Sequence, residues 1–468
     1  MASRLQGRFG RLARVPLAIA AAAGWGSTQG DGAPRPPSIV VILCDDLGYG
    51  DLGCFGHPTI RTPHLDRLAH EGQRWTSFYA AAPMCTPSRA GLLTGRWPIR
   101  SGMCSSRRRV LVPTSAGGLP PEEVTIAEAL RERGYATACF GKWHLGHGAS
   151  HRPLAQGFDQ FFGTMHSNDM GRTEDAPKGL HAFRDPREVY WRVPLYRDDA
   201  MLEPAVEQAT LTQRCTDEAV AFVRGAGDRP FFLYVPYHMP HAPQFSAPPF
   251  AGRSRRGRYG DAVEEIDASV GRLVAALDQA GRAASTLLVF TSDNGPWRAD
   301  PEVGGDVGPL RGGKGEVFEG GLRVPTIFWG PGLVRPDTVL DLGSALDLFP
   351  TVCGLAGVAP PDERALDGFD LGPVLRGDGA SARRHVFYYA GTELCAVRAG
   401  AFKAIFVTRA TVPAGRASHD PPLLYCLDRD PGERQDVAAR HPREVLDLRA
   451  RWVQQRAIAS APSQLEVR

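Results

Sequence analysis

The chain has 468 residues, of which 43% are hydrophobic and 22% are charged, a composition typical of a globular protein rather than a disordered or fibrous one. Its formal net charge of +3, without a basic stripe interleaved with aromatic residues, argues against a nucleic-acid-binding protein. No apolar run reaches the roughly 18 residues that a membrane-spanning helix requires, so a membrane-embedded protein is not expected.

The first thirty residues have the order of a secretory signal peptide. Arginines precede an apolar stretch at 15–23, and small residues follow through Ser27. An arginine-rich amphipathic tail or a transit peptide would share part of this pattern. We expect residues 1–30 to be a signal peptide and residues 31–37 a linker. The protein would then be exported, to the periplasm or the extracellular space, or to the lysosome in a eukaryote.

Nine cysteines are present, an odd number, so in an exported protein at least one thiol would have a task other than a disulfide. No pair has the C-x-x-C spacing, and a zinc ribbon or a thioredoxin-like motif is therefore not supported. Cys44, Cys139 and Cys353 lie in apolar runs, where a small buried thiol is the expected role.

Apolar strands and helices alternate along the first part of the chain. The segments 39–43, 136–140, 231–235 and 287–291 have the continuous apolar character of buried parallel strands. Helices are expected from Pro63 to 71 with Thr62 as N-cap, over 125–133, and from an N-cap at Asp261 to Gly281. This alternation predicts an α/β fold with a large, mostly parallel sheet sandwiched by helices.

The last ninety residues have a different pattern. Short strands are expected at 385–389, 394–398, 402–408 and 423–427 without helices between them, followed by a helix over 442–454. We therefore predict a catalytic domain over 38–380 and a C-terminal α+β subdomain over 381–468, built on a small antiparallel sheet.

Acidic and amide side chains follow two of the expected strands. Asp45 and Asp46 come after the first, and Asp293 and Asn294 after the later one. Ligands of open α/β sheets bind beyond the carboxyl ends of the strands, and adjacent carboxylates repel unless a cation lies between them. Each pair alone is also typical of turns or helix caps. Together they predict a site for a hard cation, Ca²⁺ or Mg²⁺.

A third segment, at residues 85–96, has the sequence CTPSRAGLLTGR. Pro87 can begin a helix, which places Cys85 at the helix N-terminus, where free N–H groups and the helix dipole favour an anion. Arg89 lies one turn further on and can reach back to the same spot. From these residues alone we expect a reactive cysteine with a lowered pKa beside the cation site. A structural thiol near a helix cap is the alternative.

This segment matches the C-x-P-S-R-x-x-L-L-T-G signature of type I sulfatases. Further matches include DDLGYGDLG from Asp45, GKWHLG from Gly141, TSDNG from Thr291 and GGKGE from Gly312. The chain thus resembles the formylglycine-dependent sulfatases of the alkaline phosphatase superfamily, most of all the arylsulfatase A and galactosamine-6-sulfatase branch. The resemblance implies an alkaline phosphatase-like fold and hydrolysis of aryl or carbohydrate sulfate monoesters.

The resemblance also implies a modified residue and a metal. Cys85 would be oxidised to Cα-formylglycine by a formylglycine-generating enzyme, and its hydrate would supply the nucleophile. A second hydroxyl of that hydrate would then expel sulfate and restore the aldehyde. One Ca²⁺, or Mg²⁺, would be held by Asp45, Asp46, residue 85, Asp293 and Asn294.

The remaining roles come from the same resemblance. Arg89 would hold the hydrate and balance the acidic pair, Lys142 and Ser167 would contact the sulfate, and His144 would take the proton of the second hydroxyl. Lys142 and His144 can reach one site if the strand breaks between them. His241 and Lys314 would bind sulfate and protonate the leaving oxygen, and the sequence leaves open which one gives the proton. His238 is a candidate supporting residue.

Two other functions share much of this pattern. A phosphonate or phosphate ester hydrolase of the same superfamily can carry the modified cysteine, and a metal-stabilised binding protein would keep Cys85 as a thiol. Substrate specificity is expected from residues 103–118 and 168–199. The run Arg107–Arg109 is either a solvated face or a border of the cleft that favours acidic substrates. The sequence names no sugar and leaves a homo-oligomer open.

Overall fold

The computed structural model of the chain describes residues 35–361, 364–411, 414–458 and 460–467. The expected signal peptide at 1–30 and the linker residues 31–34 lie outside the described residues. Pro36–Arg468 form one compact unit. Within the described ranges, no helix is both long and apolar enough to cross a membrane.

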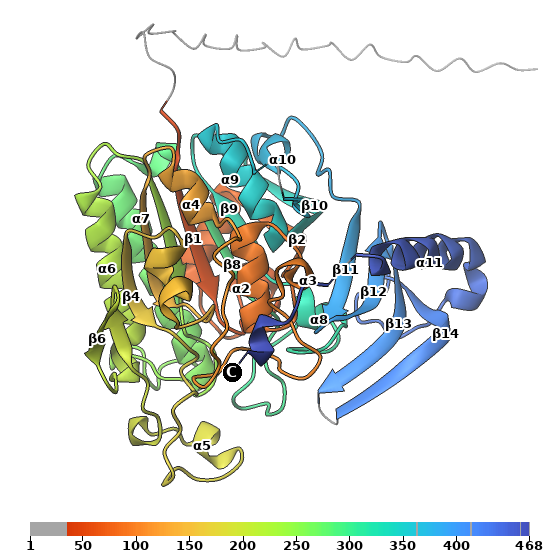
Figure 1. The fold of residues 1–468 in the computed structure, drawn as a ribbon, viewed down its shortest axis with the longest axis horizontal. Coiled ribbons are helices and arrows are strands. Elements are labelled where there is room, and N and C mark those ends of the chain that lie inside the picture. The colour runs from red at the N-terminus through yellow and green to blue at the C-terminus, as the bar shows by residue number, and fades with distance from the viewer. Residues whose placement is uncertain (1–34, 362–363, 412–413, 459, 468) are drawn as a thin grey trace, which may run out of the picture. The chain divides into compact units, whose positions relative to one another are not determined.

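Ten strands form the larger sheet, in the order β10-β2-β9-β8-β1-β7-β3-β4-β5-β6 (Figure 1). Their bounds are β1 Ser38–Cys44, β2 Gln73–Tyr79, β3 Ala136–Lys142, β4 Gln160–Thr164, β5 Leu195–Arg197, β6 Ala200–Glu203, β7 Phe231–Pro236, β8 Thr286–Ser292, β9 Thr326–Trp329 and β10 Asp337–Ser344. β1 pairs in parallel with β7 and β8, whereas β9, β5 and β6 pair antiparallel. The sheet is mixed and mostly parallel, as predicted, and all four expected strands of this region are present.

Helices cover both faces of this sheet. The α-helices of the described chain are α1 Pro63–Glu71, α2 Cys85–Thr94, α3 Pro98–Ser101, α4 Ile126–Arg131, α5 His181–Arg184, α6 Leu211–Gly225, α7 Arg258–Gln279, α8 Glu319–Leu322, α9 Leu348–Ala356, α10 Gly372–Arg376 and α11 Pro442–Arg456. Ile39 and Val41 of β1 pack with α2, α4 and α9, while Val40 and Ile42 pack with α1, α6 and α7. Because β1 is buried on both faces, it is apolar at every position from 39 to 44.

One expected helix cap is wrong, and another lacks its side-chain hydrogen bond. Thr62 is the N-cap residue of α1, as predicted, but its hydroxyl donates to Asp66 Oδ1 and accepts from Gly53 N–H instead of capping the helix. α7 begins three residues before Asp261, whose carboxylate accepts backbone N–H groups from the preceding loop, 252–254. In contrast, Thr125 caps α4 in a capping box with Glu128.

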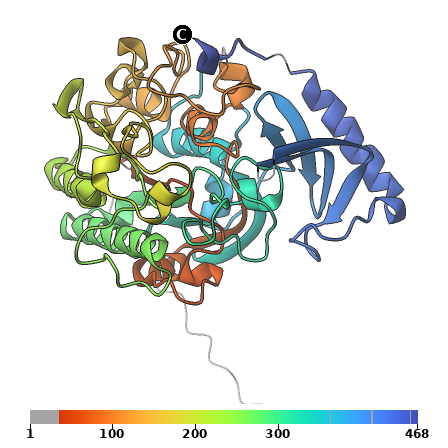
Figure 2. The ribbon, with the colours of Figure 1, turned by 90° about the horizontal axis from the view of Figure 1, so that it is seen from below.

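The C-terminal sheet is antiparallel, in the order β11-β12-β13-β14, with bounds β11 His385–Ala390, β12 Glu393–Ala399, β13 Phe402–Thr411 and β14 Ala414–Cys426. Figure 2 shows this sheet with α11 alongside it. Val445 and Leu448 of α11 pack into its apolar core. The expected start of the last strand at 423 is wrong, because β14 begins at Ala414 and pairs with β13 through a polar stretch that lacks an apolar signal.

A buried ionic cluster joins the two sheets. Glu319 of α8 accepts hydrogen bonds from Tyr79 of β2 at 2.7 Å and from Tyr388 of β11 at 2.7 Å. Lys403 of β13 donates to Glu319 at 3.0 Å and contacts Glu433 at 2.8 Å. Burial alone would raise the pKa of Glu319, but Lys403 and Arg398 lower it to about 2.

Replacing Glu319 with alanine should therefore destabilise the protein strongly. Lys403 would keep one carboxylate instead of two, and two tyrosine hydroxyls would lose their acceptor. We expect the free energy of unfolding in urea to fall by about 3–5 kcal/mol. Glu218→Ala, which removes the partly exposed partner of Arg197, should cost at most about 1 kcal/mol. Equal losses in the two variants would contradict this interpretation of the cluster.

Candidate active site

The segment after β2 delivers Cys85 to the edge of the large sheet. α2 begins at Cys85, as predicted, with Met84 as the extended N-cap residue. Pro87 lies in the first turn, where no backbone N–H is needed by the helix. Gly91 lets the helix approach closely, since a Cβ atom there would lie 2.5 Å from the Cβ of Ala81. All ten residues of α2 are buried, and Cys85 is 2% exposed.

The two acidic strand ends meet beside Cys85. β1 and β8 are parallel neighbours in a register that pairs Cys44 with Ser292, so the residues that follow them share one edge of the sheet. The Asp46 N–H donates to Asp293 Oδ1 at 3.2 Å, and Asn294 Nδ2 donates to Asp46 Oδ1 at 2.7 Å. Asp45, Asp46, Asp293 and Asn294 are all buried.

Three basic side chains face the three carboxylates. Arg89 lies 2.8 Å from Asp293 Oδ2 and 3.7 Å from Asp45 Oδ2. Lys142 Nζ contacts Asp45 Oδ2, and Lys314 Nζ lies 2.9 Å from Asp46 Oδ2. The formal charges of these six groups cancel. A divalent cation would leave the cluster positive and ready for an anionic ligand.

Several observations fit a hard cation at this edge. One ligand atom from each of Asp45, Asp46, Cys85 and His241 lies within 4.8 Å of the others. Asn294 Oδ1 is buried and has no hydrogen-bond partner among the described residues. Carboxylate and amide oxygens are the donors that Ca²⁺ and Mg²⁺ prefer. His241 belongs to this group, although the sequence analysis predicted for it only sulfate binding and protonation of the leaving oxygen.

The expected lowering of the pKa of Cys85 is wrong for the unmodified thiol. Burial raises this pKa well above its usual value, and Asp45, whose Oδ1 accepts a hydrogen bond from the thiol at 3.4 Å, raises it further. These effects outweigh Lys142 and Lys314, which lower it. The unmodified side chain is therefore a neutral thiol and not an activated thiolate.

His144 has a fixed tautomer. β3 ends at Lys142, and His144 then adopts a φ of 59°, a left-handed conformation that few residues other than glycine occupy. The strand thus breaks between Lys142 and His144, which is the condition under which both side chains can reach one site. His144 Nε2 donates to the carbonyl of Leu111 at 2.9 Å, which leaves Nδ1 without its proton in the neutral ring. Burial and Lys142 hold the pKa of His144 well below its usual value, so the ring is neutral.

His144 Nδ1 is also buried and has no hydrogen-bond partner within the described ranges. The carbonyl of His144 accepts a hydrogen bond from Thr86, the residue after Cys85, at 3.0 Å. The histidine is thus tied to the start of α2. It offers an unused acceptor of the kind that a general base needs.

The other expected residues lie around the same cluster. Lys142 Nζ donates to Ser167 Oγ at 3.0 Å. His241 Nδ1 donates to Asn168 Oδ1 at 3.1 Å, and Asn168 in turn donates to the carbonyl of Pro243 at 2.9 Å. Asn168 begins an expected specificity segment, 168–199, but its hydrogen bond with His241 was not predicted. His238 is buried and shares a 2.8 Å hydrogen bond with Thr164, at the end of β4.

A cavity of about 290 Å³ opens onto the cluster. It is lined by Asp46, Met84, Arg109, Asp169, Phe183, His241, Ala242, Trp297 and Lys314. The expected specificity segments contribute Arg109, Asp169 and Phe183. Arg109 thereby borders the cleft, one of the two interpretations of the arginine run. Trp297 was not expected, although it follows Asn294 by only three residues.

Comparison with known proteins decides the family. A family model described as sulfatase matches residues 37–358, and one described as the C-terminal region of aryl-sulfatase matches residues 381–468. The chain belongs to the sulfatase family. It is therefore a sulfuric ester hydrolase by family, with an alkaline phosphatase-like fold.

Individual sulfatases are similar over most of the chain. Arylsulfatase A of Homo sapiens is 44% identical over 427 residues, covering 86% of this chain and 83% of that protein. N-acetylgalactosamine-6-sulfatase of Homo sapiens is 40% identical, with 92% and 88% covered. Among solved structures, the PsFucS1 sulfatase from Pseudoalteromonas sp. is similar with a TM-score of 0.80 and 29% identity, covering 90% of both chains.

Proposed function

We propose that this sulfatase cleaves sulfate monoesters of aryl or carbohydrate alcohols with residue 85 oxidised to Cα-formylglycine. The observation that carries the proposal is the position of Cys85, at the N-terminus of α2 and within hydrogen-bond distance of Asp45. A formylglycine-generating enzyme would act on the chain before it folds, because the folded thiol is buried. The aldehyde hydrate would supply the oxygen that displaces the alcohol from sulfur.

We propose Asp45, Asp46, Asp293, Asn294 and residue 85 as the ligands of one Ca²⁺, or Mg²⁺. The ion would neutralise sulfate oxygens and acidify the hydroxyl group of residue 85. Arg89 spans Asp45 and Asp293 and would hold both carboxylates in place. Lys142 and Lys314, which now contact Asp45 and Asp46, would turn toward the sulfate oxygens once the ion balances those acids.

Residues on two sides of the cluster would carry out the proton transfers. His241 and Lys314 line the cavity, where the leaving alcohol would lie, and one of them would protonate its oxygen. His144 would take the proton of the second hydroxyl through Nδ1, because its Nε2 proton is held by the carbonyl of Leu111. Lys142 and Ser167, joined at 3.0 Å, would orient the sulfate.

Replacing His144 with alanine should slow the second half of the reaction. We expect kcat to fall by about 10²–10⁴, while the alcohol from the first turnover is still released as a burst because His144 acts after it leaves. Rapid-quench measurement of p-nitrophenol from p-nitrophenyl sulfate would show this. His70→Gln, at an exposed histidine of α1, should behave as wild type. A variant that loses the burst together with kcat would assign His144 to the first step.

The alternative activities are separated by direct assay. The phosphonate monoester hydrolase of Agrobacterium radiobacter has a similar fold, with a TM-score of 0.60 and 22% identity. We expect the protein to cleave p-nitrophenyl sulfate faster than p-nitrophenyl phosphate at the same pH, and the reverse order would reject the proposal.

The arginine-rich, apolar start of the chain supports export to the periplasm, the extracellular space or the lysosome.

A further inference from the structure

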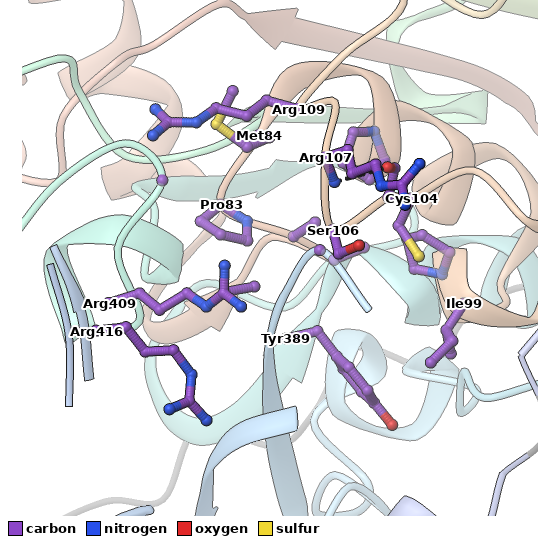
Figure 3. Close-up of a pocket in the computed structure, with 18 of the residues that line it drawn as sticks. Pro83, Met84, Ile99, Cys104, Ser106, Arg107, Arg109, Tyr389, Arg409 and Arg416 are labelled. Atoms are coloured by element: carbon purple, nitrogen blue, oxygen red, sulfur yellow. Dashed lines mark hydrogen bonds between the residues drawn. The ribbon is translucent and has the colours of Figure 1, made fainter. Parts of the chain in front are cut away.

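A second cavity, of about 400 Å³, adjoins the active-site cavity and shares Met84 and Arg109 with it. Figure 3 shows its residues converging from the start of α2, the segment after α3 and the C-terminal sheet. Four arginines line it, and the described lining contains no acidic residue. They are Arg107, Arg109, Arg409 and Arg416.

Two of these arginines are held in place by one carboxylate. Glu393 accepts hydrogen bonds from Arg409 at 2.7 Å and from Arg416 at 2.6 Å. One negative charge therefore orients two guanidinium groups from β13 and β14. Figure 3 shows the Arg409 side chain directed toward the space beside Pro83.

The positive charges of the other two arginines are balanced less fully by nearby carboxylates. Arg107 lies 3.9 Å from Glu466 and its side chain is 84% exposed. Arg109 makes no ion pair with any residue that the structure describes. The pocket therefore carries an excess of positive charge beside a site that already takes one anion.

The basic lining continues along the C-terminal sheet. A larger hollow, of about 710 Å³, shares Arg409 and Arg416 with the second cavity and adds Arg449 and Arg456, against two acidic lining residues, Glu393 and Asp420. Arg449 is paired with Asp420 at 2.6 Å, and Arg456 stacks on Trp452 with its guanidinium carbon 4.4 Å from the ring centroid. Successive basic hollows suit a chain with repeated anionic groups better than a compact ligand with one.

We propose that the substrate is a sulfated oligosaccharide with a second anionic group, sulfate or carboxylate, which binds in this arginine pocket. The inference rests on the proposed function and names its substrate class. Because the two cavities share walls, one ligand can fill both. The apolar lining of Pro98, Ile99 and Tyr389 supplies faces for a sugar ring between its charged groups. A small aryl sulfate has one anionic group and would fill only the active-site cavity.

The test uses sucrose octasulfate as an inhibitor of p-nitrophenyl sulfate hydrolysis. We expect competitive inhibition by the wild type. In the double variant Arg409→Gln/Arg416→Gln the inhibition constant should rise at least about tenfold, since two charge-assisted contacts are lost. The KM for p-nitrophenyl sulfate should not change, because neither residue lines the active-site cavity. Circular dichroism would verify folding, and Arg107→Gln is a second variant, with a smaller expected rise.

Arg197→Gln is the matched control. Its side chain is 49% exposed and pairs with Glu218 at 2.6 Å, whereas Arg416 is 50% exposed and pairs with Glu393 at 2.6 Å. Equal inhibition constants in wild type, control and both pocket variants would overturn the inference, and so would non-competitive inhibition. If the wild type releases sulfate neither from p-nitrophenyl sulfate nor from a sulfated oligosaccharide, the proposed function fails. Calorimetric titration with sucrose octasulfate needs no turnover and would then still test the pocket. The Kd of the double variant should be at least about tenfold higher than that of the wild type.

Discussion

Replacing Cys85 with alanine is expected to lower kcat/KM for p-nitrophenyl sulfate by at least about 10⁴-fold while the protein stays folded. The variant lacks the side chain from which the nucleophilic oxygen is made, and no neighbouring group can replace it. The remaining cluster can still bind the substrate, so the loss should appear in kcat. Steady-state kinetics with the wild type, made together with a formylglycine-generating enzyme, give the reference.

Two further variants sharpen this prediction. Cys353→Ala removes another buried thiol, in α9, and should keep full activity. Cys85→Ser keeps an oxygen but has no second hydroxyl, so we expect it to release at most one alcohol per protein molecule before it stalls. Full turnover by Cys85→Ala with an unchanged circular dichroism spectrum would refute the proposed mechanism.

Removal of the divalent ion should abolish activity and lower stability together. Asp45, Asp46 and Asp293 are buried within one cluster, and without the ion they depend on Lys142, Lys314 and Arg89. We expect dialysis against a chelator to remove activity and added Ca²⁺ to restore it. At a Ca²⁺ concentration 100 times its Kd, the free energy of unfolding should rise by about 2.7 kcal/mol.

Asp46→Asn tests whether the two effects share one site. The variant should lose the Ca²⁺-dependent activity and the Ca²⁺-dependent shift in thermal unfolding, because Asp46 would be a ligand and the partner of Lys314. If Mg²⁺ but not Ca²⁺ restores activity, the proposed ion would be Mg²⁺ and the proposed ligands would stay the same. Full activity in excess chelator would contradict a metal-dependent mechanism.

The sheet and its acidic edge could be predicted because their signals are local. β1 and β8 are continuous apolar runs with acidic residues directly after them, and parallel pairing brings those residues together. In the Cys85 segment, Pro87 predicts the start of a helix. Assigning a role to His144 required the family motif, because no local turn signal in the sequence predicts its left-handed backbone.

The features that sequence reasoning missed depend on partners outside the local element. Asp261 satisfies the loop before α7 and not the helix, a competition that the sequence does not reveal. Arg409 and Arg416 line a pocket with Pro83, more than 300 residues earlier in the chain. They lie on the paired ends of β13 and β14, 408–411 and 414–417, which lack an apolar pattern. The pKa of Cys85 is raised and not lowered as expected, because burial and Asp45 outweigh Lys142 and Lys314.

The central claim concerns the chemical state of residue 85. Mass spectrometry of the tryptic peptide that contains it, from protein made together with a formylglycine-generating enzyme, tests the claim most directly. We predict an aldehyde or its hydrate at residue 85, in a preparation that cleaves p-nitrophenyl sulfate. An unmodified thiol in a preparation that is equally active would contradict the proposal.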